Sequence, residues 1–293
     1  MISLAGLTKR YGKRRGIEGV DLAVGQGEIF GFLGPNGAGK TTTIRVLLGF
    51  LRATSGTAHI LGCDSWRAGH VARRDVGYLP GDLRLYPWFT ARSGLNLVSR
   101  IRGMRNGDAA AALLRRFDLD PAVTVRKMSR GTRQKLGLLL ALAHEPHLIV
   151  LDEPTSALDP LVRDELSRIL RERAATGATV FFSSHTLSDV ESLCDRIAIV
   201  RNGRIVADET LASLRARATR EVMIRFRDSE RASTTASPDG LRVHERAGPV
   251  WHGELVGEPA QLVAFLHAVD AVDFTVGAPD LQGIFRSYYR EEG

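Results

Sequence analysis

Short apolar runs alternate with amphipathic stretches along the first 215 residues. The runs "GEIFGFLG" (27–34), "LIVLDE" (148–153) and "TVFFSSH" (179–185) are typical of strands buried in a parallel sheet. The first two precede segments with helical apolar spacing, "TTTIRVLLGFL" and "LVRDELSRILRERAA". This strand–helix order predicts an α/β sheet whose ligands bind beyond the carboxyl ends of the strands.

Other patterns surround this sheet. Residues 2–9 and 20–24 indicate an opening antiparallel β piece, 57–62 and 76–80 are strand-like, and 196–208 predict a hairpin with Asn-Gly at its turn. From about 90 to 145 the spacing is helical, which predicts a helical subdomain inserted into the α/β order. The first domain therefore spans 1–215.

The pattern changes near 210–220. Residues 220–293 predict a small α+β domain with a hairpin and one helix, followed by a last helix. That last helix places four apolar or aromatic residues on one face, which we interpret as a docking face: Leu281, Ile284, Phe285 and Tyr288.

Composition narrows the functions that the chain can have. The net charge is +7, carried by 35 Arg and only 5 Lys, which allows an anionic partner or a solvated arginine-rich surface. Two cysteines are too few for a disulfide framework or a metal cluster. The longest apolar stretch, 136–143, is too short to cross a bilayer, and no signal-peptide pattern opens the chain. We therefore expect a cytoplasmic protein whose membrane part, if it has one, is another polypeptide.

A phosphate-binding loop follows the strand at 27–34. "GPNGAGKT" fits G-x-x-x-x-G-K-[ST] and lies between a strand and a helix, as that motif requires. Glycines let the backbone amides surround a phosphate, Lys40 places a charge on the β- and γ-phosphates, and Thr41 offers its hydroxyl to Mg²⁺. The loop comprises Gly34, Pro35, Asn36, Gly37, Ala38, Gly39, Lys40, Thr41 and Thr42.

Two acids and a histidine lie at the ends of two of the predicted buried strands. Adjacent strand residues point to opposite sides, so Asp152 and Glu153 have different predicted roles. Asp152 would hold Mg²⁺, and Glu153 would act on the water that attacks the γ-phosphate. His185 belongs on the same edge, where it would contact the γ-phosphate or Glu153.

A second phosphate-binding helix start appears at "MSRGTRQKLGL" (128–138). Ser129 is a good helix N-cap and Gly131 permits close approach, but no Lys-Ser/Thr pair follows. This half-site could only complete a site that is built elsewhere.

The order of these pieces resembles the nucleotide-binding subunit of ATP-binding-cassette (ABC) transporters over residues 2–215. The resemblance implies a P-loop NTPase fold of the ABC type, with a mixed sheet, an antiparallel β piece and a helical subdomain. It also implies two subunits that sandwich two ATP molecules, each held by one chain's phosphate loop and the other chain's signature helix. By this match, further nucleotide or dimer contacts come from Tyr11 (on adenine), Ser129, Gly131, Gln134 and Asp159.

The sequence departs from the family pattern at two places. Arg130 and Thr132 replace residues of the common LSGGQ signature, as in variants from exporters with a separate membrane subunit. Gly81 stands where the family usually has a glutamine that ligates Mg²⁺. We expect Asp82 or a water to replace that ligand, and this loop mainly to sense the membrane partner.

These features predict an ATPase subunit of a bacterial drug or lipid exporter that uses ATP and Mg²⁺. Its expected partners are an integral membrane permease and a second nucleotide-binding subunit, at the cytoplasmic face of the membrane and without nucleic acid. The tail resembles the C-terminal domain of daunorubicin-resistance ATPases. Segment 82–90, with Leu85, Tyr86, Trp88 and Phe89, is either the permease contact or core packing. Two other functions are left open: a non-transport ABC ATPase acting on ribosomes or DNA, and a small-metabolite kinase.

Overall fold

The chain folds into two units in a computed structural model that describes residues 1–12, 14–103, 107–256 and 259–290. Unit 1 comprises Met1–Asp208 and unit 2 comprises Glu209–Gly293. Each unit has its own hydrophobic core, and we describe them separately.

Unit 1 begins with an antiparallel sheet of order β2-β1-β4-β5. Its strands are β1 (Ile2–Tyr11), β2 (Arg14–Val24), β4 (Ser55–Ile60) and β5 (Cys63–Asp64). Along β1 the buried Ile2 and Leu4 alternate with exposed residues, as expected for a sheet that is covered on one side.

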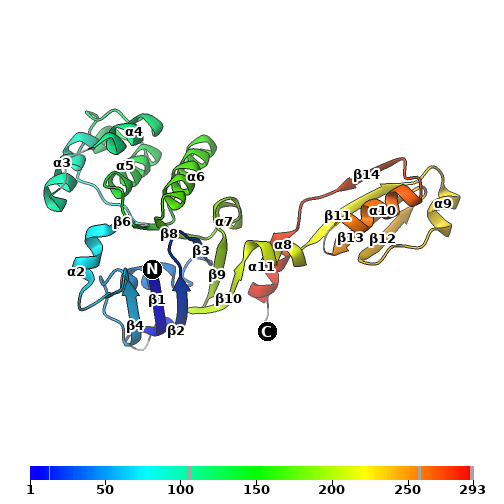
Figure 1. Ribbon diagram of the computed structural model, residues 1–293, viewed down its shortest axis with the longest axis horizontal. Helices are drawn as coiled ribbons and strands as arrows, with labels where there is room; N and C mark the ends of the chain where they lie inside the picture. Colours follow the sequence, from blue (N-terminus) through cyan, green and yellow to red (C-terminus); the bar gives the residue numbers. More distant parts are fainter. Residues whose placement is uncertain (13, 104–106, 257–258, 291–293) are drawn as a thin grey trace. The chain divides into compact units, whose positions relative to one another are not determined.

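A six-stranded sheet of order β10-β9-β3-β8-β7-β6 forms the centre of unit 1 (Figure 1). Its strands are β3 (Ile29–Leu33), β6 (Val76–Leu79), β7 (Leu148–Asp152), β8 (Thr179–Ser184), β9 (Arg196–Arg201) and β10 (Arg204–Thr210). Strands β9, β3, β8, β7 and β6 are parallel, and every residue of β3, β7 and β8 is buried. Their carboxyl ends therefore meet at one edge. Asn202 and Gly203 turn the β9–β10 hairpin with positive φ, as the sequence predicts.

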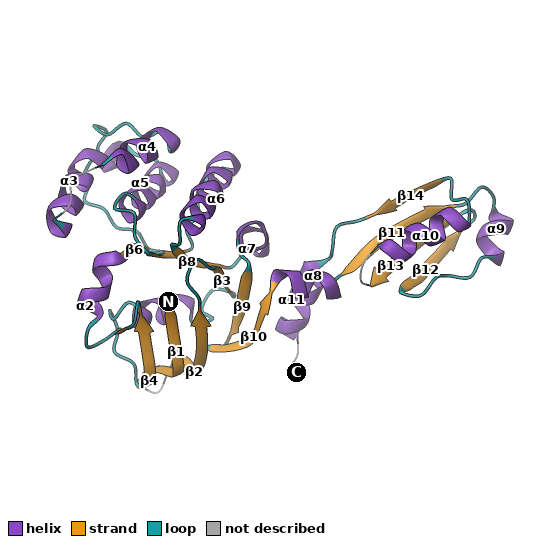
Figure 2. Cartoon of the chain, viewed as in Figure 1, coloured by secondary structure: helices purple, strands orange, loops and turns teal. Residues whose placement is uncertain are grey.

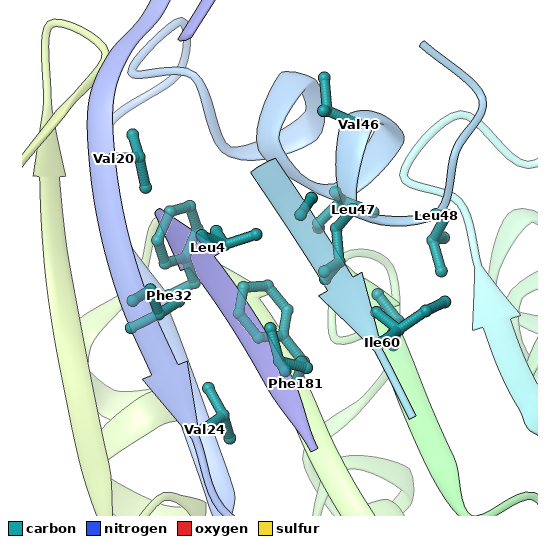
Figure 3. Close-up of a cluster of buried hydrophobic side chains, with 14 of the residues drawn as sticks. Leu4, Val20, Val24, Phe32, Val46, Leu47, Leu48, Ile60 and Phe181 are labelled. Atoms are coloured by element: carbon teal, nitrogen blue, oxygen red, sulfur yellow. The ribbon is translucent and has the colours of Figure 1, made fainter. Parts of the chain in front are cut away.

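Helix α1 (Lys40–Leu47) lies between the two sheets, where it contacts β1, β4 and β7. Figure 3 shows Leu47 of α1, Leu4 of β1 and Phe181 of β8 in the core between the sheets. Helices α6 (Pro160–Ala175) and α7 (Leu187–Leu193) pack on β8, on the opposite face of the central sheet in Figure 2. The short α2 (Gly69–Ala72) precedes β6. This layering buries the parallel strands on both faces and confirms the predicted α/β class.

The segment between β6 and β7 is helical, as predicted. It contains α3 (Ala91–Arg102), α4 (Asp108–Arg116) and α5 (Arg130–Leu142), and α5 contacts both α3 and β6. Thr90 and Ser93 form a capping box at the start of α3, and Gly103 ends it in the left-handed conformation.

Unit 2 contains an antiparallel sheet of order β12-β13-β11-β14. Strands β11 (Thr219–Arg225), β12 (Leu241–Ala247), β13 (Val250–Val256) and β14 (Asp273–Val276) pack with α9 (Ser229–Thr234) and α10 (Ala260–Ala268) around Trp251. Its indole nitrogen donates to Ala232 O at 2.9 Å. Helices α8 (Leu211–Arg217) and α11 (Leu281–Arg290) contact each other, and Leu281 and Phe285 are buried.

Unit 2 is richer in elements than the sequence predicts. The strands of the hairpin, α10 and the last helix appear where expected, but α8, α9 and β14 were not anticipated. Those three elements have four to seven residues each, which is too short to display a clear hydrophobic period.

Candidate active site

The phosphate-binding loop joins β3 to α1 and forms the floor of a cleft of about 610 Å³. Gly37 and Gly39 have φ of 82° and 109°, which side-chain-bearing residues rarely adopt, so the loop conformation requires glycine there. A Cβ on Gly39 would also lie 2.7 Å from Ile17 Cγ2. The cleft is lined by Tyr11, Arg14, Gly16, Asn36, Gly37, Gly39, Lys40, Thr41, Thr42 and Glu153.

Lys40 lies at the bottom of this cleft and is 6% exposed. Its Nζ donates to Gly34 O at 2.6 Å and to Pro35 O at 3.3 Å, and lies 3.1 Å from Glu153 Oε1. The loop carbonyls therefore fix the ammonium group at the start of α1, where helix amides and this charge together favour an anion.

Asp152 is fully buried at the end of β7. Its Oδ2 accepts a hydrogen bond from Thr41 Oγ1 at 2.7 Å, and its Oδ1 accepts one from Ser183 Oγ at 2.6 Å. The parallel register that pairs Asp152 with Ser183 brings these groups together. A carboxylate beside a hydroxyl offers the hard oxygen ligands that Mg²⁺ prefers.

Glu153 and His185 meet across the carboxyl ends of β7 and β8. His185 Nδ1 lies 2.6 Å from Glu153 Oε2, so Glu153 contacts Lys40 through one oxygen and His185 through the other. The Glu153 side chain is 18% exposed and that of His185 is 51% exposed. A carboxylate held in this way at the cleft is placed to accept a proton from a bound water.

The segment at 128–138 lies outside the cleft lining. Ser129 Oγ accepts from Thr132 N at 3.1 Å and caps α5, and a Cβ on Gly131 would lie 2.8 Å from Ala157 O. Gln134 is buried, and its Nε2 donates to Pro154 O of the same chain at 3.0 Å. Asp159 accepts from Val162 N and caps α6. Among the described residues, the cleft thus gathers the phosphate loop, Tyr11 and Glu153 but none of these four.

The loop after β6 has Gly81 where the family usually has a glutamine. A Cβ on Gly81 would lie 3.3 Å from Asp152 Oδ2, so position 81 is beside the carboxylate that the sequence assigns to Mg²⁺. The Asp82 carboxylate instead pairs with Arg84 at 2.8 Å and is 68% exposed. Its tentative role as a ligand stays a prediction.

Arg14 also lines the cleft but was not predicted as a site residue. The available signal was the basic run "KRR" at 13–15, two residues after Tyr11. Ser183, which binds Asp152, was also missed, because a serine in an apolar strand has no distinctive spacing.

Within the described residues, no helix combines the length and the hydrophobicity that a bilayer span requires. The same residues contain no group of three or more His, Cys, Asp or Glu side chains that could hold a metal ion.

The chain is similar to known proteins in both sequence and fold. A family profile described as "ABC transporter" matches residues 17–156. The chain is 30% identical to the linearmycin resistance ATP-binding protein of Bacillus subtilis, over 97% of both chains. It is 39% identical to a daunorubicin resistance ATP-binding protein of Streptomyces coeruleorubidus, over 73% of this chain and 70% of the relative.

Among solved structures, the chain is similar to a dimeric ATP-binding cassette bound to ADP and phosphate. The TM-score is 0.63 with 25% identity, over 72% of this chain and 99% of that one. None of these descriptions favours an ATPase that acts on ribosomes or nucleic acid. From its motifs, fold and relatives, the chain belongs to the ATP-hydrolysing, ATP-binding proteins of ABC transporters.

Proposed function

We propose that two copies of this chain sandwich two ATP molecules, and that their hydrolysis drives export through a separate membrane permease. The observation that carries the proposal is the division of the site. The phosphate loop and Glu153 line one cleft, and His185 lies 2.6 Å from Glu153, whereas Ser129 and Gly131 do not line that cleft. A half-site of this kind needs a second molecule, and the dimeric cassette among the similar structures supports that arrangement.

The roles of the side chains follow from their positions in the cleft. The adenine would stack on Tyr11, which is 46% exposed, and the β- and γ-phosphates would bind the loop amides and Lys40. Glu153 accepts a proton from the water whose oxygen attacks the γ-phosphorus, and the bond from that phosphorus to the ADP oxygen breaks. His185 holds the Glu153 carboxylate and contacts the γ-phosphate.

Mg²⁺ fits the oxygen atoms of Thr41 and Asp152 at this cleft. When bound, the ion would be held by Thr41 and Asp152 and would neutralise negative charge on the phosphates during hydrolysis. The same two side chains orient the end of the phosphate loop, because their hydrogen bond joins α1 to β7.

Two surfaces of unit 1 support a contact with a membrane permease at the cytoplasmic face of the membrane. A cleft of about 360 Å³ between α3, α5 and β6 has an apolar floor that includes Leu79 and Leu140, with Arg73 and Arg102 beside it. Tyr86 and Trp88 stack on each other with ring centroids 5.3 Å apart and are about two-thirds exposed. In contrast, Phe89 is buried, so only part of segment 82–90 is core.

The named relatives support an antibiotic or other hydrophobic compound as the exported cargo. One relative is named for linearmycin resistance and another for daunorubicin resistance. The permease would select the cargo, since the clefts of this chain described above are a phosphate site and a docking groove.

The substitution Glu153→Gln tests the hydrolytic role. It should lower ATP turnover by about 100-fold or more, because removal of a general base typically costs that much. ATP-dependent dimers should then accumulate, as measured by light scattering in the presence of ATP and Mg²⁺. Glu145→Gln is the matched control, since Glu145 pairs with Arg173 on the surface and is 60% exposed. Normal hydrolysis by the Glu153→Gln chain would refute the assignment.

Mixing two inactive variants tests the sandwich directly. Lys40→Ala should disable the phosphate loop, and Ser129→Arg should block the helix start that faces the partner's ATP. Each variant alone should lack turnover, but a mixed dimer contains one site with both surfaces intact. Recovery of activity on mixing supports two-chain sites. If the mixture stays inactive while both variants still dimerise with wild-type chains, the sandwich is wrong.

A further inference from the structure

The backbone at Glu153 has an unusual conformation for a residue with a side chain. Its φ is 53°, in the left-handed region that favours glycine. Such a conformation persists only where the surroundings over-determine it. Here Glu153 N donates to both Ser183 Oγ and Ser183 O at 3.2 Å, and Gln134 donates to Pro154 O at 3.0 Å.

A third anchor is Asp189, on α7. Thr155 Oγ1, two residues after Glu153, donates to Asp189 Oδ2 at 2.7 Å. Ser184 Oγ, directly before His185, donates to the same oxygen at 3.2 Å and accepts from Thr186 N at 2.9 Å. One carboxylate oxygen therefore binds the segment that carries Glu153 and the segment that carries His185.

The environment of Asp189 favours these hydrogen bonds, of which the one from Thr155 is the shorter at 2.7 Å. Its side chain is only 10% exposed, and Arg163 of α6 lies 3.7 Å from its other oxygen. An ionised carboxylate only accepts hydrogen bonds, so both hydroxyls must point their hydrogens toward it. Charge-assisted bonds of this type are shorter and stronger than bonds between neutral groups. Asp189 does not line the nucleotide cleft, so it would act through its neighbours.

We propose that Asp189 is a positioning residue for ATP hydrolysis, which fixes Glu153 and His185 at their mutual distance of 2.6 Å. This inference rests on the proposed roles of those two residues. Without the Asp189 carboxylate, Thr155 and Ser184 lose the acceptor that they share, so the segments that carry Glu153 and His185 are no longer held together there. The carboxylate then samples positions in which it cannot take the proton of the attacking water, whereas the phosphate loop that binds ATP keeps its contacts.

The first experiment separates turnover from binding. Asp189→Ala should lower kcat by about 10-fold to 100-fold, as expected for a displacement of catalytic groups by about an ångström. The KM for ATP should stay within about twofold, because Lys40 and the loop amides are untouched. Asp189→Asn keeps an acceptor oxygen in place and should recover most of the loss. Asp164→Ala, an exposed acid of α6, is the matched control and should behave as wild type.

The second experiment asks whether the effect passes through Thr155. Thr155→Val removes the hydroxyl at nearly constant volume and should reproduce the fall in kcat. Adding Asp189→Ala to Thr155→Val should then lower kcat by less than the single Asp189→Ala change does, because the bridge is already broken. Binding of a fluorescent ATP analogue and the melting temperature confirm that each variant is folded.

Several results would overturn the proposal. The first is a folded Asp189→Ala chain with the kcat of wild type, and the second is an Asp189→Ala chain in which only KM changes. The third is a double variant whose fall in kcat equals the product of the two single effects. If Asp189→Ala does not fold, wild-type kcat in Thr155→Val overturns it by itself. Failure of the proposed function looks different, because the wild-type chain would then not hydrolyse ATP or Glu153→Gln would remain active.

Discussion

Replacing His144 should change how the stability of unit 1 depends on pH. Burial, together with the positive charge of Arg102, lowers the pKa of His144 from 6.5 to about 4. Its Nε2 lies 3.3 Å from Val76 O, which can only accept a hydrogen, so the neutral ring carries its proton on Nε2. Nδ1 is buried without a hydrogen-bond partner among the described residues, so a second proton there would be unsatisfied.

Proton uptake by the unfolded chain sets the direction in which stability changes with pH. Below pH 6.5 the unfolded chain protonates His144, but the folded chain does so only near pH 4. The stability that the neutral ring contributes is complete above about pH 6.5, falls as the pH drops toward 4, and does not change further below that. Between pH 7 and pH 5 the free energy of unfolding would fall by about 2 kcal/mol if the whole pKa shift contributed. Because the ring is partly exposed to solvent, we expect roughly half of this, about 1 kcal/mol.

The comparison uses His144→Gln, whose amide N–H can still donate to Val76 O, and His147→Gln, which removes an exposed histidine on the same segment. Melting temperatures of unit 1 are measured at pH 7 and pH 5. Wild type and His147→Gln should lose about 2–4 °C more on acidification than His144→Gln does. An equal loss in all three chains would show that His144 is not held neutral, and the reasoning would fail.

Four stability predictions test the two cores and the helix starts, each measured by chemical denaturation. Phe181→Ala should cost about 3–5 kcal/mol in unit 1, because the fully buried ring lies between Phe30 and Phe32; a loss under about 1 kcal/mol contradicts this packing. Trp251→Ala should cost a similar amount, about 3–5 kcal/mol, in unit 2 alone. Thr90→Ala should cost about 1 kcal/mol through loss of the α3 capping box, and an unchanged midpoint argues against the cap. Gly77→Ala should cost roughly 1–3 kcal/mol, since its Cβ would lie 2.1 Å from Ala141 O, and a neutral result contradicts this close approach.

Much of unit 1 could be predicted because local sequence and tertiary environment agree. The strand at 148–152 is apolar up to Asp152 and is buried throughout, and the loop at 34–42 carries Gly37 and Gly39 where the backbone has positive φ. Asp152 and Glu153 followed from their place at a strand end, because parallel strands bring such ends to one edge.

Other features depend on partners distant in sequence, which a single sequence does not specify. Thr155 and Asp189 are 34 residues apart and meet only because α7 packs beside β8. The family resemblance implies a nucleotide contact for Gln134, yet its Nε2 donates to Pro154 O of the same chain. In segment 82–90, no periodicity distinguishes the exposed Trp88 from the buried Phe89.

The left-handed backbone at Glu153 implies that this position gives up folding stability in exchange for ATP turnover. Glycine would relax this conformation, and protein stability would rise by up to about 1 kcal/mol while the carboxylate is lost. Glutamine would remove the charge but retain the strained backbone. A Glu153→Gly chain that melts above the Glu153→Gln chain would therefore measure how much folding free energy this enzyme gives up to hold its base in place.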